Sequence, residues 1–500
     1  MSQAAVADGI GALRSPAPSL AIPASRERAA PRDAFPHTKR PLPWFLAGFL
    51  AVLFFVPIDS TELKVNIGVD SHPDRLAVIV LVLAWLWFGG DQRAFLRTRR
   101  STLFTTAVCV FLMFAVASLL LDAGRIINLG DFQLAEKRFA LLGSFLILSW
   151  FALTALRFED LRGFASYLIG LAVLMSIGML VERKTGYNVF YEWSRAILGP
   201  IAKVAPSPTD IHPEFGSEGR VTVVGPTQHG LAATTMLVVV MPFALVRVLD
   251  ATSRRSWWLN ATAFALMFCA ALATDRKTAM LVPVALVIYI ALYRPRQVLR
   301  LLPVGLVLLL GLAHFAAPGA LGTVLDINSA ASSTSTTHRE GDFTDITPDV
   351  LAHPLVGRGF GTLNPEQPSQ FRINDDEYLD ELWEVGFVGL LAFVWMILAP
   401  VAIARAAIRS RGPTVASLTL AASGGCVAFL VVCALFDALS FPQAPYMFFV
   451  VAALTTIAAA GPEGNVEPLR ARARQGTERR RRGIAVASAA TGGVAHTRRA

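Results

Sequence analysis

The sequence predicts an all-α polytopic membrane protein with about twelve transmembrane helices and two large extracytoplasmic loops. Three observations support this fold class. Of the 500 residues, 54% are hydrophobic and only 16% are charged. Apolar runs long enough to cross a hydrocarbon core of about 30 Å recur along the chain. The connections between these runs alternate between basic segments and segments that are longer or poorer in Lys and Arg.

The expected transmembrane domain covers residues 42–460, with a tail on each side. Its apolar runs predict spans at roughly 42–58, 76–90, 102–121, 139–156, 163–181, 230–249, 257–274, 279–293, 301–317, 385–404, 415–436 and 446–460. Residues 1–41 are rich in Ala, Pro and Arg and have no apolar signal-peptide segment, so we expect a disordered cytoplasmic tail. Residues 461–500 are basic, and we expect them to form a second such tail.

Charge sets the predicted topology. The net charge of +9 comes mostly from the tails and from short connections, so it indicates cytoplasmic loops and not a nucleic-acid partner. Basic tails also suit anionic lipid headgroups. The short basic connections carry Arg93, Arg97, Arg99 and Arg100; Arg157 and Arg162; Arg247, Arg254 and Arg255; Arg294, Arg296 and Arg300; and Arg405, Arg409 and Arg411.

Two outward loops are large enough to carry function, because irregular backbone does not face lipid. The first, 182–229, contains four aromatic residues, which suit either stacking on sugar rings or an interfacial belt. These aromatic residues are Tyr187, Phe190, Tyr191 and Trp193. The second loop, 318–384, holds most of the polar residues that could do chemistry.

Three arginines, Arg220, Arg276 and Arg339, stand beside predicted spans on the outward side. A guanidinium binds two phosphate oxygens at once and keeps its charge. Arg220 on its own is as easily explained as a solvated side chain, and Arg276 as a partner of Asp275. We favour function for Arg276, because it and Lys277 place two cations in a short outward connection, against the charge bias.

Six acidic residues precede the tenth span. Asp376, Asp380 and Glu384 fall on one face at helical spacing. A solvated, dipole-stabilised first turn explains such a run equally well, although the interleaved Leu379 and Trp383 require burial. We expect one or two of the carboxylates to face a cavity. The six are Asp375, Asp376, Glu377, Asp380, Glu381 and Glu384.

Glycines punctuate the same stretch and permit positive φ or close backbone approach. They occur in HPLVGRGFG, with Pro354, Gly357 and Gly359, and in GFVG, with Gly386 and Gly389. The histidines nearby, including His229, are expected to be structural. No cluster of metal-ligand residues stands out, and we expect neither a metal nor a cofactor.

These residues resemble a known family, the O-antigen ligase and O-antigen polymerase superfamily of bacterial envelope glycosyltransferases. The resemblance rests on GRVTVVGPTQHG, TDRKTAM, HREGDFTDITPDVLAHPLVGRGFG and DDEYLDELWEVGFVG. Family members show Pro-x-x-Gly-x-Gly, then a His-Asn or Asp-Asn pair, then Gly-x-x-Gly at the start of a span. Ligases that transfer glycan to the lipid A core usually have His where this chain has Asp375, so it resembles the polymerase or exopolysaccharide branch more closely.

The resemblance implies a glycosyltransferase-C-like fold and metal-independent, inverting glycosyl transfer at the outer face of the bacterial inner membrane. The donor would be a polyprenyl-diphosphate-linked oligosaccharide and the acceptor a growing glycan, with other polysaccharide-assembly proteins as partners. Arg276, Arg339 and Asp375 would be catalytic. The diphosphate and glycan would be bound by Arg220, Lys277, Arg358, Asp376, Glu377 and Glu384.

Three alternatives stay open. Ligase-type transfer to another acceptor uses the same motifs. A polysaccharide or lipid transporter suits the number of spans, but carriers show two similar halves and charges at midplane, which this sequence lacks. A metal-dependent membrane glycosyltransferase needs a compact acidic motif in the first outward loop, where Glu62, Asp70 and Asp74 are spread apart.

Overall fold

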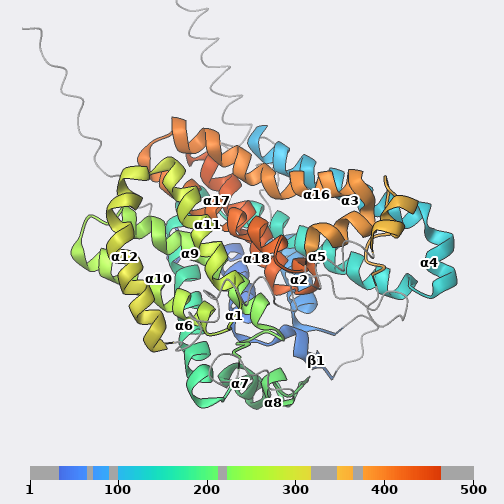
Figure 1. The fold of residues 1–500 in the computed structure, drawn as a ribbon, viewed down its shortest axis with the longest axis horizontal. Helices are drawn as coiled ribbons and strands as arrows, with labels where there is room; N and C mark the ends of the chain where they lie inside the picture. The colour runs from blue at the N-terminus through green and yellow to red at the C-terminus, as the bar shows by residue number, and fades with distance from the viewer. Residues whose placement is uncertain are drawn as a thin grey trace, which may run out of the picture.

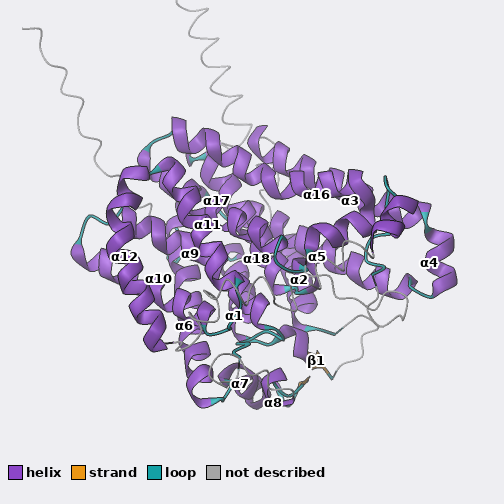
Figure 2. Cartoon of the chain, viewed as in Figure 1, coloured by secondary structure: helices purple, strands orange, loops and turns teal. Residues whose placement is uncertain are grey.

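A computed structural model describes residues 33–64, 71–88, 99–211, 222–316, 346–363 and 376–462. This part of the chain is a bundle of helices with a single short pair of strands (Figures 1 and 2). Each of the twelve expected spans is occupied by a helix. These are α1 Leu42–Phe55, α2 Pro73–Phe88, α3 Arg99–Leu121, α5 Phe132–Ala155, α6 Leu161–Thr185, α9 Gly230–Leu249, α10 Arg254–Leu272, α11 Thr278–Tyr293, α12 Pro295–Ala316, α16 Glu377–Ser410, α17 Pro413–Cys433 and α18 Gln443–Ala460.

The all-α polytopic class is confirmed. Seven helical segments in the described ranges are long and apolar enough to cross a membrane, and α1 and α11 are shorter apolar helices. The full count of twelve spans stays a prediction. The helices that begin furthest ahead of their predicted spans are α5, at Phe132, and α16, at Glu377. Both early turns contain charged residues, and these lower the apolar signal without interrupting the helix.

The connections contain short elements of their own: α4 Ala123–Leu129, α7 Val189–Leu198, α8 Pro208–Ile211 and a helical turn at 346–352. Strands β1 Thr61–Leu63 and β2 Ala202–Val204 pair in antiparallel register, with Thr61 opposite Val204. This small sheet joins the loop after α1 to the loop after α7. Two predicted outward connections are therefore in contact.

The centre of the bundle is α18, which is almost entirely buried and packs against α5, α9, α16 and α17. Small residues set how closely α17 approaches α9. A Cβ on Gly424 would lie 2.7 Å from Pro242, and one on Gly425 would lie 2.8 Å from the carbonyl oxygen of Val239. Close backbone approach through small residues is the usual way that membrane helices pack.

Within the described residues, four of the predicted cytoplasmic connections meet at one end of the bundle, which we call the basic end. Arg247 donates to the carbonyl of Arg162 at 2.7 Å, and Arg294 pairs with Asp250 and donates to Ser417 at 2.6 Å. The described parts of four other connections contact one another at the other end, which we call the loop end: the loop after α1, the segment before α9, the turn between α10 and α11, and the start of α18. The charge bias predicts that the basic end faces the cytoplasm.

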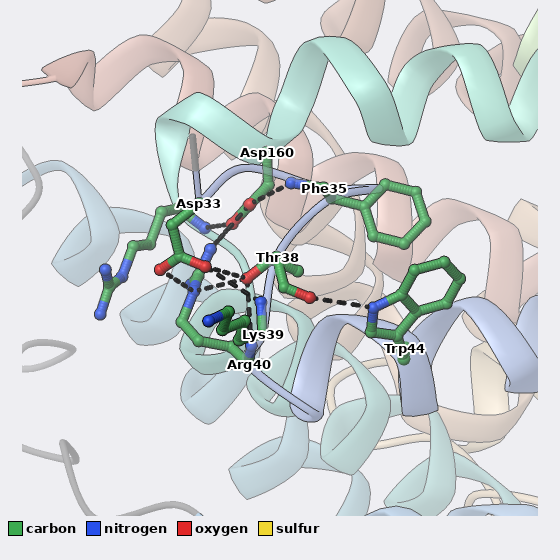
Figure 3. A network of polar contacts seen from close by, with 8 residues as sticks. Asp33, Phe35, Thr38, Lys39, Arg40, Trp44 and Asp160 are labelled. Atoms are coloured by element: carbon green, nitrogen blue, oxygen red, sulfur yellow. Dashed lines mark hydrogen bonds and ion pairs between the residues drawn. The ribbon is translucent and has the colours of Figure 1, made fainter. Parts of the chain in front are cut away.

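The expected disordered tail is ordered from Asp33 to Pro41 (Figure 3). Its anchor is the buried carboxylate of Asp160, between α5 and α6. Asp160 accepts hydrogen bonds from the backbone N–H of Phe35 at 2.9 Å and from the Arg40 guanidinium at 2.7 Å. A Cβ on Gly163 would lie 2.0 Å from the carbonyl oxygen of Phe35, so only glycine fits there. These long-range contacts explain why composition alone failed to predict an ordered segment.

Candidate functional site

A pocket of about 400 Å³ opens at the loop end. Its walls come from the loop after α1, the loop after β2, the segment 222–229 that precedes α9, and the connection between α10 and α11. Its polar lining consists of Ser60, Thr209, Thr222, Gln228, His229 and Arg276. Three connections between spans, one of which contributes two segments, therefore converge on one concave surface.

Arg276 brings the positive charge to this pocket. Its Nη2 lies 3.2 Å from Nε2 of His229, the residue that caps the N-terminus of α9. The neighbouring Asp275 adopts a positive φ of 56°. The carboxylate of Asp275 pairs with the buried Arg183 guanidinium of α6 at 2.7 Å. This pair fixes the tight turn from which Arg276 extends.

The segment 222–229 is held by the end of α6. The buried Glu182 carboxylate accepts from the backbone N–H of Val224 at 3.3 Å and of Gly225 at 3.0 Å. The side chain of Asn188 donates to both Glu182 and the carbonyl of Gly225. The pocket wall is thus set by buried polar contacts, which keep their geometry because water is excluded.

Asp59 joins the pocket to the N-terminus of α18. Its backbone carbonyl accepts from Gln228 at 2.7 Å, and its carboxylate accepts from Gln443 at 2.6 Å. Burial raises the pKa of the Asp59 carboxyl to about 6. Gln443 is itself fully buried, so this contact couples the pocket to the centre of the bundle.

The acidic run at the start of α16 is not a solvated face. Glu377, Asp380, Glu381 and Glu384 are all buried. Glu377 accepts from the backbone N–H of Leu439 at 2.7 Å. Glu381 is 1% exposed, and its Oε2 has no hydrogen-bond partner among the described residues. Burial of this kind is costly for an ionised group. The cluster is therefore a functional candidate.

Glu384 has a structural task. Its carboxylate accepts from the backbone N–H of Gly361 at 2.7 Å and of Leu363 at 3.3 Å, and it lies 3.8 Å from the guanidinium of Arg138. Asp376 caps α16 by accepting from the N–H of Tyr378. Both residues were predicted to bind substrate. In the structure Glu384 instead binds the backbone that follows the glycine turn, and Asp376 binds the first turn of α16.

The glycines of the turn have the conformations expected for them. Gly357 and Gly359 have φ of 70° and 109°, and Gly386 has φ 69° and ψ −175° in a kink inside α16. The N–H of Gly359 donates to the carbonyl of Glu384 at 2.8 Å, and the N–H of Phe387 donates to the carbonyl of Pro354 at 2.9 Å. The turn therefore satisfies backbone groups that the kink leaves free. Gly389 lies one turn further along α16, where a Cβ would meet Val385.

Two of the predicted cationic ligands lie outside the pocket lining. The Arg358 guanidinium donates to Asp349 at 2.6 Å and lies 5.1 Å from the ring centroid of Trp383. Lys277 is exposed at the start of α11. Arg220, Arg339 and Asp375 lie outside the described residues. Among the cations predicted to bind the diphosphate, Arg276 is the one that the described structure places in the pocket.

A short loop before α18 connects the pocket with the carboxylates. The backbone N–H of Leu439 donates a hydrogen bond to Glu377. Two residues later, the ring centroid of Phe441 lies 5.5 Å from that of the His229 imidazole. Two residues of chain span at most about 7 Å. The cationic pocket and the acidic cluster are therefore neighbours at the loop end.

Sequence reasoning missed the parts of this site that come from single polar residues. His229 was expected to be structural, and it does cap α9, but its ring also lies beside Arg276. Asp59 and Gln443 gave no signal at all. The one available clue was the position of Gln228 and His229 immediately before a span, within the motif GPTQHG.

Residues 262–394 match the family described as O-Antigen ligase. The match covers Arg276, the glycine turn and the acidic start of α16, and it confirms the resemblance to the O-antigen ligase and polymerase superfamily. A search of curated proteins finds no match to this chain.

Proposed function

We propose that this chain, which carries an O-antigen ligase domain over residues 262–394, polymerises polyprenyl-diphosphate-linked glycan repeat units. The family match supports glycosyltransferase activity of the O-antigen ligase or polymerase type in general, acting on lipid-linked glycans in the bacterial inner membrane. The polymerase reaction, the inversion of configuration and the orientation of the site toward the outside are parts of the proposal.

The observation that carries the proposal is Arg276 beside His229 in an open pocket. Transfer from a lipid diphosphate needs mainly positioning and positive charge, because the diphosphate is already a good leaving group. A guanidinium can hold two of its oxygens and stabilise the charge that develops as the sugar leaves. We assign Arg276 to that task, with Arg220, Arg339 and Lys277 as further candidate diphosphate ligands.

The carboxylates at the start of α16 suit the acceptor. In the proposed step, a hydroxyl oxygen of the acceptor glycan attacks the anomeric carbon of the donor. The bond between that carbon and the diphosphate oxygen breaks, and the hydroxyl proton passes to a carboxylate. Asp375 is the candidate base that the family pattern indicates. Glu381 is a second candidate, because its buried Oε2 is free of hydrogen bonds within the described part of the chain.

The position of the charges argues against transport. Glu377, Asp380, Glu381 and Glu384 occupy the first two turns of the 34-residue helix α16, and Arg183 lies in the last turn of α6. Carriers place such groups near the middle of the bilayer. In the described structure these charges instead gather at the loop end, as a surface-facing enzyme site requires.

Glycan chain length in cells tests the proposal. Cells lacking the protein would be complemented with wild type or with Arg276→Ala at matched expression. A polymerase predicts that a single lipid-linked repeat accumulates and that wild type alone restores long chains. Long chains that stay on the lipid carrier would identify a ligase instead. Unaltered glycan in every strain would contradict both activities.

A further inference from the structure

Helix α7 has a broad apolar face, and the rest of the protein buries only part of it. Phe190, Tyr191 and Ser194 are buried, whereas Trp193 and Ile197 are 68% and 71% exposed. Successive residues of a helix are about 100° apart, so Trp193 and Ile197 flank one edge of the buried strip. Glu192 and Arg195, which pair with each other at 2.6 Å, lie on the opposite side. An exposed apolar strip on an amphipathic helix is typical of helices that lie in a membrane interface.

The depth of α7 supports this interpretation. Gly186 ends α6 with φ 69°, and α7 then packs against the side of α6. A Cβ on Gly178 would lie 2.5 Å from the ring of Phe190. Gly178 is seven residues before the end of α6, which is about 10 Å of helix. The same ring stacks on Phe55, the last residue of α1, at 6.4 Å. Helix α7 therefore lies at the level of the final turns of the apolar helices.

Along the chain, the exposed strip follows an exposed apolar face of α6. Leu174, Ile177 and Val181 are exposed along one face of α6, which is a candidate span. Tyr187 is exposed in the turn to α7, and Trp193 and Ile197 follow on α7 itself. Trp and Tyr are enriched where a membrane meets water.

We propose that α7 is an interfacial helix, with Trp193 and Ile197 inserted into the leaflet at the loop end of the bundle. Aromatic and aliphatic side chains on this strip then contact hydrocarbon, and the Glu192–Arg195 pair faces water. Figure 1 shows α7 near the end of α6, at the edge of the bundle.

This placement fixes the height of the pocket relative to the membrane. The Tyr191 hydroxyl donates to the carbonyl of Thr227 at 3.1 Å and lies 3.0 Å from the hydroxyl of Ser60, a pocket residue. If the proposed function holds, a membrane-inserted α7 holds the pocket at the level of the headgroups, where the diphosphate of a lipid-linked donor lies.

Site-directed spin labelling in lipid vesicles tests the position of α7. The full chain would carry Cys109→Ser, since Cys109 is the exposed thiol and the other three cysteines are buried. A nitroxide would be attached to Ile197→Cys or Trp193→Cys, with Arg195→Cys as the control on the same helix. Collision with oxygen and with a water-soluble nickel complex would be compared.

We expect the oxygen-to-nickel collision ratio to be several-fold higher at 197 and 193 than at 195. Equal access of the nickel complex to all three labels would overturn the proposal and place α7 in water, open to a glycan or a protein. Protection of 197 from both reagents would also overturn it, by showing that protein covers the strip. Because the readout is depth and not glycan transfer, either failure leaves the proposed function standing.

Discussion

The carboxylate of Asp275 lies 2.7 Å from the guanidinium of Arg183, and both side chains are almost fully buried. The pair joins the end of α6 to the turn between α10 and α11. Arg276, the next residue, extends from that turn into the pocket. The position of the proposed diphosphate ligand thus depends on an ion pair that does not line the pocket.

Asp275→Asn tests this dependence. Asn tolerates the positive φ of Asp275, so the change removes the charge without straining the backbone. Removal of one partner of a buried ion pair typically costs about 3–5 kcal/mol. We expect a clearly lower melting temperature in detergent and a large loss of transfer. Glu192→Gln, which breaks an exposed pair, serves as the control and should change the melting temperature little.

The kink of α16 requires glycine. Gly386 has a backbone conformation that is essentially restricted to glycine, and a Cβ there would lie 2.5 Å from backbone atoms of Leu355 and Val356. Backbone strain of this kind alone costs about 1–3 kcal/mol. Gly386→Ala should destabilise the protein by more than that, because the new Cβ would also clash with the backbone. Gly143→Ala, in an open position of α5, should not lower the melting temperature. Equal melting temperatures for the two variants would refute the structural role of the kink.

Glu381 and Glu384 are expected to respond differently to the same change. Glu384→Gln weakens acceptance from two backbone N–H groups and the interaction with Arg138, so it should lower stability. Glu381→Gln breaks no hydrogen bond of the described structure, so stability should be kept. If Glu381 takes the proton of the acceptor, transfer should fall about 100-fold or more. Paired melting curves and transfer rates separate the two, and normal transfer by Glu381→Gln would leave Asp375 as the candidate base.

The raised pKa of Asp59 implies that the stability of the protein depends on pH. Burial raises its pKa to about 6, above the ordinary value of 3.8, so the folded state binds the proton more tightly than the unfolded state. Its contribution to stability is therefore present at low pH and is lost as the pH rises through about 6. Asp59→Asn should flatten the decline of melting temperature between about pH 4 and 7. An unchanged profile would show that Asp59 is not the titrating group.

The helices of this fold were predictable because each needs only a long apolar run. All twelve runs became helices, and the error lay at ends such as Glu377, where charged turns continue the helix. The ordered segment around Phe35 and Arg40 was not predictable, since it depends on one buried carboxylate, Asp160, more than a hundred residues away.

Those parts of the site that follow local sequence rules were also predictable. Arg276 and the glycines were found because local rules make them unusual: cations in a short outward loop, and Pro-x-x-Gly-x-Gly before a span. One or two of the six carboxylates were expected to face a cavity, but the burial of four of them, including Glu377 and Glu381, was not expected, because a run of acids at a helix start normally faces water. His229 joins Arg276 only through the packing of α9 against α10.

Glycan transfer by the purified protein is the decisive test of the proposed role of Arg276. Wild type, Arg276→Ala and Arg195→Ala would be reconstituted in lipid vesicles with a polyprenyl-diphosphate-linked repeat, and the length of the lipid-linked product would be measured. Arg195 is exposed on α7 and lies outside the pocket lining, so it controls for loss of positive charge at the loop end. We expect longer lipid-linked chains with wild type and Arg195→Ala, and none with Arg276→Ala. Chain growth that is unaffected by Arg276→Ala would contradict that role.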